Sequence, residues 1–215
     1  MTAQAGSVTS PSSLAIQAER IHLRRHALSA RRAISAADRK TAARQLAALF
    51  DRYRLLKPQL RIGLYLAMPS ELDLSDVITR AQRRHCQLYV PHIVNNTRRQ
   101  MRFVKLLSTS RLQRHRLGMP QLTDDNRQHI QTPKLDLVLV PTVAFDTQGH
   151  RLGMGAGFYD RHFAYLKHRR WQRPRLIGIA YSAQQATHIP TYAHDISLPR
   201  VLTERGMIDC RHAKI

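Results

Sequence analysis

The chain has 215 residues, enough to bury one sizeable core, and no internal shift of composition divides it into two domains. With 35 lysines and arginines against 14 aspartates and glutamates, its formal net charge is +21. Such a charge attracts polyanions but does not choose among them. Cys86 and Cys210 lie far apart and outside any C-x-x-C spacing, which excludes a disulfide framework and a zinc knuckle. We therefore expect a reducing, cytoplasmic location.

The N-terminal residues are small and polar, and their lack of a long apolar run or a cationic start argues against a signal peptide. We expect residues 1–13 to form a disordered lead-in and residues 14–215 to form one domain. The longest apolar stretch, from Leu137 to Phe145, is far shorter than the roughly 20 residues of a membrane helix and is interrupted by Pro141. The sequence therefore predicts a soluble protein.

Two helices are predicted in the first quarter of the chain. A basic segment from Leu14 to Ile34 contains few helix breakers. Ser35 followed by Asp38 resembles a loose capping box that opens a second helix. Apolar side chains recur in that second helix at the helical period, which predicts a face that packs against the core. This face comprises Leu46, Leu49, Phe50 and Tyr53.

From Arg61 onward, short apolar runs replace the helical pattern and predict strands. The runs are RIGLYLAM (61–68), QLYVPHI (87–93), MRFVKL (101–106), LDLVLVPTVAF (135–145) and RLIGIAYS (175–182). DVITRAQRRH predicts a helix between the first two runs, and NNTRRQ from Asn95 predicts a turn between the second and third. Strands separated by helices predict an α/β fold, a single domain with a largely parallel sheet flanked by helices.

The segment from Arg151 to Arg161, RLGMGAGFYDR, carries the most chemical information. It follows a predicted strand and leads into a predicted helix. Glycines at 153, 155 and 157 let the backbone approach a ligand closely, and free N–H groups at the start of the helix favour an anion. The pattern is neither a Walker A loop nor the G-x-G-x-x-G of dinucleotide folds. By glycine spacing alone, an ordinary tight loop is an equal alternative to a phosphate site.

Two charged neighbours favour the phosphate site. Arg151 can neutralise phosphate charge, and Asp160, in the first helical turn, can hold a magnesium ion through a carboxylate oxygen. The alternative for Asp160 is a residue that only stabilises the helix dipole. His22 and His26, at i and i+4, have no third ligand near in sequence, so we expect solvated side chains rather than a zinc site.

Several segments together resemble the 5-formyltetrahydrofolate cyclo-ligase family. FDTQGHRLGMGAGFYDR is similar to the family signature, and LDLVLVPTVAF is similar to the strand that carries it. Further similar segments occur in the same order, so that the resemblance spans about residues 20–205. They are LRRHALSARRAIS, YLAMPSELDL, YVPHI and IAYSAQQATHIPTYAHDISLPRVLTE.

The resemblance implies an enzyme of one-carbon folate metabolism that cyclises 5-formyltetrahydrofolate to 5,10-methenyltetrahydrofolate and releases ADP and phosphate. The γ-phosphoryl group of ATP would move to the formyl oxygen, after which the N10 amine attacks and phosphate departs. No side-chain nucleophile is required, so catalysis is expected to rest on positioning and charge neutralisation. The implied partners are small molecules, and we expect a monomer without a membrane segment.

The resemblance also implies which residues bind the two substrates. The ATP site is expected to comprise Arg20, Arg24, Arg151, Leu152, Gly153, Met154, Gly155, Ala156, Gly157, Phe158 and Tyr159. The folate site is expected to comprise Leu66, Glu71, Met154, Gly155, Ala156, Gly157 and Phe158. Glu71 would accept hydrogen bonds from the donor-rich pterin ring. From the residues alone, Glu71 is an ordinary loop carboxylate, and Arg20 and Arg24 are two charges on a basic helix.

Four residues are expected to take part in the reaction or to hold the metal. The resemblance implies that Arg151 and Tyr159 are catalytic and that Asp160 and Asp195 bind Mg²⁺. From the residues alone, Asp195 in AHDI is a turn residue.

Two other functions remain open from the sequence. An Arg-rich RNA-binding protein without enzyme activity would explain the charge, although the chain lacks an RNP, KH or helix-turn-helix pattern. Another phosphate-handling α/β enzyme, such as a sugar-phosphate isomerase, would share the fold class, although the segment from Arg151 to Arg161 argues against it.

Overall fold

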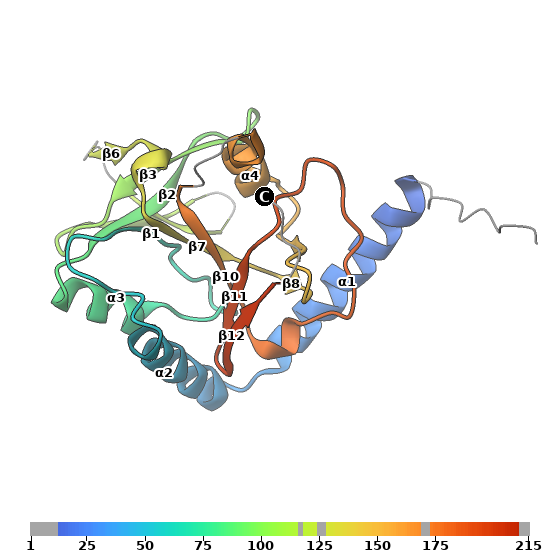
Figure 1. The fold of residues 1–215 in the computed structure, drawn as a ribbon, viewed down its shortest axis with the longest axis horizontal. Coiled ribbons are helices and arrows are strands. Elements are labelled where there is room, and N and C mark those ends of the chain that lie inside the picture. Colours follow the sequence, from blue (N-terminus) through green and yellow to red (C-terminus); the bar gives the residue numbers. More distant parts are fainter. Residues whose placement is uncertain (1–12, 116–117, 124–127, 169–172, 211–215) are drawn as a thin grey trace, which may run out of the picture.

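Figure 1 shows the fold, for which a computed structural model describes residues 13–115, 118–123, 128–168 and 173–210. The helices are α1 (Ser13–Ala33), α2 (Ala36–Arg52), α3 (Ser75–Arg83) and α4 (Phe158–Phe163), with short 3-10 helices η1 (Thr132–Lys134), η2 (Ala164–His168) and η3 (Ser182–Gln184). The strands are β1 (Arg61–Gly63), β2 (Gln87–Asn95), β3 (Gln100–Lys105), β4 (Leu112–Arg114), β5 (Pro120–Leu122), β6 (His129–Ile130), β7 (Leu137–Pro141), β8 (Ala144–Phe145), β9 (Arg151–Leu152), β10 (Arg175–Ile179), β11 (Arg200–Thr203) and β12 (Gly206–Asp209).

Eight strands form one sheet in the order β12-β11-β10-β7-β1-β2-β3-β6. The central pairings are parallel: β1 pairs with β2 and β7, and β10 pairs with β7 and β11. The outer pairings, β2 with β3, β3 with β6 and β11 with β12, are antiparallel. The predicted α/β fold with a largely parallel sheet is therefore confirmed, as is the β-α-β unit formed by β1, α3 and β2.

Two hydrophobic layers cover the sheet, one on each face. Leu137 and Leu139 of β7 belong to the core cluster that includes α2 and α3, whereas Val138 and Val140 belong to the cluster that includes α4. Figure 1 shows α2 and α3 on one side of the sheet and α4 on the other. Because side chains alternate along a strand and both faces are buried, β7 has the near-continuous apolar sequence from which it was predicted.

The two predicted N-terminal helices are present with the predicted boundary between them. Ser35 caps α2, and its Oγ accepts a hydrogen bond from the N–H of Asp38 at 3.1 Å. Residues 1–12 of the predicted lead-in lie outside the described residues, and Ser13 is the first residue of α1. None of the described helices is long and apolar enough to cross a membrane.

The predicted core face of α2 holds for three of its four residues. Leu46 and Phe50 are fully buried, and Leu49 packs partly buried against the same cluster. Tyr53 instead follows the last turn of the helix and is 39% exposed. Its hydroxyl accepts a hydrogen bond from the N–H of Met207 at 3.2 Å, so a neighbouring hairpin and not the core fixes this side chain.

Predicted strands end before their apolar runs do, most clearly in the runs at 61–68 and 135–145. The run at 61–68 pairs as a strand only to Gly63, and beyond Leu64 the chain turns away from the sheet although its side chains remain apolar. The run at 135–145 forms β7 and then, beyond Thr142, the separate β8–β9 hairpin. Apolar sequence reports burial, and burial continues after sheet pairing has ended.

The predicted turn NNTRRQ joins β2 to β3. The N–H of Arg98 donates to Oδ1 of Asn95 at 2.8 Å, and Arg99 adopts a φ of 52°. This turn brings Arg99 near the glycine-rich segment, since a side chain added at Gly157 would contact an Nη1 of Arg99 at 3.3 Å.

Candidate active site

The predicted site residues follow three neighbouring parallel strands. The segment after β1 carries Glu71, the segment after β7 carries the glycine loop (residues 153–157), and the segment after β10 carries Asp195. Because β1, β7 and β10 run parallel, their carboxyl ends lie at one edge of the sheet, which is where open α/β sheets bind ligands. The topology therefore brings separate parts of the sequence to one edge.

A pocket of about 780 Å³ lies between α1, the glycine loop and the segment after β10. Its lining includes eight residues predicted from the sequence: Arg20, Arg24, Arg151, Gly153, Gly155, Gly157, Asp160 and Asp195. It also includes charged and aromatic residues to which the sequence analysis assigned no role: Arg99, Arg161, Lys167 and Tyr192. No local pattern could have found Arg99 or Tyr192, because only the fold brings their segments to the loop.

The glycine loop has the backbone that its glycines predicted. Gly155 and Gly157 have φ values of +102° and +68°, a region that L-residues with a side chain rarely adopt. A Cβ added at Gly155 would meet no atom of the described residues within 4 Å, so among them the space beside the loop is open to a ligand. Nε of Arg24 donates to the carbonyl oxygen of Gly153 at 2.8 Å and ties the loop to α1.

Arginines predicted to bind phosphate are paired with the aspartates predicted to bind metal. Nη2 of Arg151 lies 2.6 Å from Oδ1 of Asp160, and Nη1 of Arg20 lies 2.5 Å from Oδ2 of Asp195. A second hydrogen bond of 3.1 Å joins Nη2 of Arg20 to Oδ1 of Asp195, and the guanidinium stacks 4.7 Å above the Tyr192 ring. These pairs hold the lining of the pocket in place.

The aspartates of this pocket neutralise its arginines only in part. The Arg151 side chain is almost fully buried, and its Nε finds no hydrogen-bond partner among the described residues. Burial lowers the pKa of the Arg24 guanidinium, and the nearby charge of Arg20 lowers it further, against a smaller opposing effect of Asp195. A buried donor without an acceptor and two adjacent cations both favour an anionic ligand.

Glu71 and Leu66, the predicted folate contacts, do not line this pocket. Glu71 lines a second cavity of about 580 Å³, and Leu66 packs partly buried against the main core cluster. Oε2 of Glu71 accepts the N–H of Met68 at 3.0 Å, and Oε1 lies 3.8 Å from Nη1 of Arg31. Burial raises the pKa of the Glu71 carboxyl, and the Met68 N–H and Arg31 oppose that shift with smaller effects.

Arg31 was not predicted as a site residue. Its side chain is buried beside Glu71, and its Nε finds no hydrogen-bond partner among the described residues. Burial lowers the pKa of its guanidinium, while Glu71 acts in the opposite direction. In the sequence, Arg31 is one of many basic residues on a helix, and its burial appears only once α1 is packed.

Tyr159 lies within electrostatic reach of both regions. Burial is the main cause of the raised pKa of its phenol, which the charge of Glu71 raises further and the charge of Arg151 lowers. Its ring stacks on Phe163 at a centroid distance of 6.1 Å. The other loop residues divide by burial: Leu152 is buried, Phe158 is half-buried, and Met154 and Ala156 are exposed.

The fold and the pocket define an α/β protein that offers arginines and a glycine loop to an anionic ligand at the carboxyl edge of a largely parallel sheet. The profile of the 5-formyltetrahydrofolate cyclo-ligase family matches residues 16–204, and the chain belongs to this family. The family resemblance and the expectation of an enzyme are therefore confirmed. The alternative of an RNA-binding protein without enzyme activity is set aside.

Individual relatives agree with this assignment. The 5-formyltetrahydrofolate cyclo-ligase of Escherichia coli (strain K12) is 30% identical over 173 residues, which cover 80% of this chain and 93% of the relative. The 5-formyltetrahydrofolate cyclo-ligase of Haemophilus influenzae is 31% identical over 145 residues, which cover 66% of this chain and 74% of the relative. The solved structure of Aquifex aeolicus 5,10-methenyltetrahydrofolate synthetase, 24% identical, matches with a TM-score of 0.71 over 89% of this chain and 93% of that one. It shows that the fold is shared.

Proposed function

We propose that this chain converts 5-formyltetrahydrofolate to 5,10-methenyltetrahydrofolate with ATP as co-substrate, and that the pocket beside the glycine loop binds the ATP phosphates. The observation that carries the proposal is the convergence of Arg20, Arg24 and Arg151 on the glycine loop in a chain of the cyclo-ligase family. Such a pocket offers charge-assisted hydrogen bonds to phosphate oxygens.

The chemistry explains why ATP is needed. The formyl group of the substrate is an amide, whose carbonyl oxygen is a poor leaving group. Transfer of the γ-phosphoryl group to this oxygen releases ADP and leaves the formyl carbon bonded to a phosphate leaving group; N10 attacks this carbon and loses its proton. Phosphate then departs with the former formyl oxygen, and the methenyl bridge remains. The protein supplies orientation and positive charge and no covalent nucleophile.

The buried guanidinium of Arg151 supports a contact with phosphate. Its Nε is a buried donor without an acceptor among the described residues, and it belongs to the same side chain that pairs with Asp160. A phosphate oxygen would satisfy this donor. We propose that Arg151 contacts the reacting phosphoryl group, which would give it the catalytic role expected from the sequence, and that Tyr159, whose phenol is influenced by the charges of both Glu71 and Arg151, helps to orient the reactants.

The donor set fits a magnesium ion at Asp160 and Asp195. Carboxylate oxygens are preferred Mg²⁺ ligands, and Oδ2 of Asp160 accepts no hydrogen bond from the described residues. The N–H of Ile196 donates to Oδ1 of Asp160 at 3.2 Å, which places the Asp195 segment beside it. When bound, Mg²⁺ neutralises charge on phosphate oxygens. We propose that Asp160 and Asp195 would hold it while their arginine partners turn to the phosphates.

The folate is proposed to extend from the glycine loop toward Glu71 and Leu66. The Glu71 carboxylate can accept hydrogen bonds from pterin N–H groups, and Arg31 lies beside it.

Cys86 and Cys210 are both free thiols, which supports a reducing, cytoplasmic location.

The test is the growth of methenyl absorbance after 5-formyltetrahydrofolate is mixed with the enzyme, ATP and Mg²⁺. We expect product only when ATP and a divalent cation are both present, and we expect Arg151→Gln to lose turnover. Arg200→Gln is the matched control, because Arg200 forms an exposed ion pair with Asp209 away from the pocket lining. Equal rates with and without ATP would contradict the proposal.

A further inference from the structure

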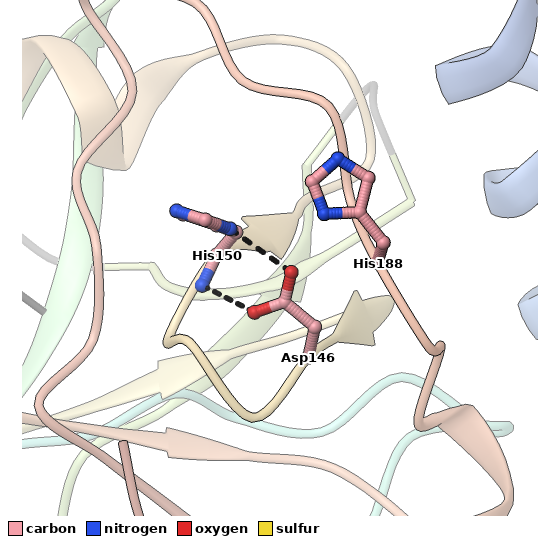
Figure 2. Close-up of side chains that lie close together, drawn as sticks. All are labelled: Asp146, His150 and His188. Carbon is pink, nitrogen blue, oxygen red and sulfur yellow. Dashed lines mark hydrogen bonds and ion pairs between the residues drawn. The ribbon is translucent and has the colours of Figure 1, made fainter. Parts of the chain in front are cut away.

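A second group of chemically competent side chains lies outside the pocket lining. Asp146, His150 and His188 each offer a ligand atom, and these atoms all lie within 4.8 Å of one another (Figure 2). Among the described residues, they form the one group of three histidine, cysteine or acidic side chains with this spacing. Asp146 follows β8, His150 precedes β9, and His188 lies in the segment after η3.

Asp146 is the fixed centre of this group. Its side chain is fully buried, and Oδ1 accepts the N–H groups of Gln148 at 3.0 Å and His150 at 2.9 Å. Oδ2 accepts the N–H of Ile189 at 3.0 Å and lies 2.9 Å from Nδ1 of His150. The carboxylate therefore joins the β8–β9 turn to the segment that carries His188 and orients the His150 ring.

The two histidines leave one side of the group open. The His150 side chain is 27% exposed, and His188 is exposed. Their ring centroids are 6.3 Å apart with an interplanar angle of 89°, and Figure 2 shows a His188 ring nitrogen facing the Asp146 carboxylate. Zinc ligands at bonds of about 2.0–2.2 Å lie roughly 3–3.5 Å from one another. The ligand atoms lie within 4.8 Å of one another, so metal binding requires the exposed His188 side chain to move closer to the other two.

We propose that Asp146, His150 and His188 form a binding site for a borderline transition-metal cation of the Zn²⁺ class. Two imidazole nitrogens with one carboxylate oxygen suit Zn²⁺, whereas Mg²⁺ and Ca²⁺ prefer all-oxygen sites. The metal takes the place of the proton between Nδ1 of His150 and Oδ2 of Asp146. That proton moves to Nε2 of the same ring, so the imidazole remains neutral. Water fills the remaining coordination position.

The site adjoins the walls of the proposed ATP pocket. His150 directly precedes Arg151, and His188 lies two residues before Pro190, whose carbonyl oxygen accepts a hydrogen bond from Nη1 of Arg20 at 2.8 Å. A bound metal links these two segments in the folded chain only. It therefore stabilises the native state and raises the melting temperature.

The full chain, without a histidine tag, is titrated with Zn²⁺ in competition with a chromophoric chelator. We expect one equivalent to bind and to raise the melting temperature. His188→Gln and His150→Asn should each lower the affinity by roughly 10- to 100-fold, the range that loss of a ligand's supporting partner already causes. The matched control is the double variant His22→Gln, His26→Gln, which removes two exposed histidines at helical spacing on α1 and should bind as the wild type does.

The His188→Gln variant decides the outcome, because this exposed side chain can be changed without disturbing the core even if His150→Asn fails to fold. Wild-type affinity in His188→Gln, or loss of binding in the α1 double variant, overturns the proposal. Ring closure measured with Mg²⁺ and no Zn²⁺ should be unchanged in His188→Gln. Failure of the zinc site is therefore distinguishable from failure of the proposed function.

Discussion

The two ends of the candidate site hold charge in different ways. Around the glycine loop, arginines form close ion pairs with aspartates in the lining of a pocket, as Nη1 of Arg20 does with Oδ2 of Asp195 at 2.5 Å. Around Glu71, one arginine and one carboxylate are buried together, and the distance from Nη1 of Arg31 to Oε1 of Glu71 is 3.8 Å. At the first end, arginines can exchange aspartate for an anion that enters the pocket. At the second end, the longer ion pair offsets the loss of solvent only in part.

At the Glu71 end, the longer ion pair leaves the effect of burial on each pKa larger than the effect of the partner's charge. Burial raises the pKa of the Glu71 carboxyl and lowers the pKa of the Arg31 guanidinium, so each partner is pushed toward its neutral form. Variants at the loop end should therefore act mainly on ligand binding. Variants at the buried end should act on folding stability as well.

The largest expected effect is at the glycine loop, where Gly155→Val should abolish turnover. A β-branched residue disfavours the φ of +102° and fills the open space beside the loop. Gly118→Val is the matched control, because Gly118 also has a positive φ, +83°, and no atom within 4 Å of an added Cβ, but lies outside the pocket lining. Turnover and circular dichroism should be measured for both variants.

The two valine variants should have similar helical signals and different rates. Equal rates in both variants would show that the open space beside Gly155 is not used by a ligand.

The next effect concerns the metal: Asp160→Asn and Asp195→Asn should each raise the Mg²⁺ concentration needed for half-maximal rate by about tenfold. Asparagine keeps an oxygen that can accept the arginine hydrogen bond, but it lacks the charge that opposes a cation. Asp209→Asn is the control, because Asp209 pairs with Arg200 at 2.7 Å on the surface. Rates across a Mg²⁺ titration measure the effect.

Thermal melts of the same variants separate metal binding from the helix-dipole alternative for Asp160. That alternative predicts only a stability loss of about 0.3–1 kcal/mol. Wild-type Mg²⁺ dependence in both variants would withdraw the metal assignment.

The smallest effect is expected in the pH dependence of stability at the buried end. Because burial raises the pKa of Glu71 above 4.5, its carboxyl binds a proton more tightly in the folded chain than in the unfolded chain. Its contribution to stability is therefore present at low pH and is lost as pH rises from about 4.5 through the folded pKa. Glu71→Gln removes this titration. The free energy of unfolding of the variant, measured with denaturant, should therefore rise relative to that of the wild type as pH increases across this window.

Above the window, the difference between Glu71→Gln and the wild type should stay constant. Glu19→Gln, an exposed change on α1, serves as the control. A difference of the opposite sign would mean that the attraction of Arg31 for the charged carboxylate exceeds the cost of burial.

Local patterns predicted more of the fold than of the site. The cap at Ser35, the turn after Asn95 and the continuous burial of β7 follow from neighbouring residues, and each is present in the structure. The end of pairing at Gly63 and the β11–β12 hairpin were not predicted, because pairing depends on residues far away in sequence.

The candidate site likewise combines one contiguous motif with residues that only the fold brings to it. The glycines and Arg151 form one contiguous motif, which the sequence could identify. Arg99 enters the pocket lining from the β2–β3 turn, and Arg31 is buried beside Glu71 by the packing of α1. In a chain with 35 basic residues, charge alone cannot single these two arginines out.

The division of the site into a phosphate end and a folate end is tested most directly by calorimetry. ATP and 5-formyltetrahydrofolate are titrated separately into Arg24→Gln and Glu71→Gln. Arg24→Gln should lower the affinity for ATP by roughly 10- to 100-fold, as expected for loss of a charged hydrogen bond. Its affinity for 5-formyltetrahydrofolate should be nearly unchanged. Glu71→Gln should do the reverse, because an amide offers donors where the pterin needs an acceptor. Equal weakening of both ligands in both variants would contradict the division of the site into a phosphate end and a folate end.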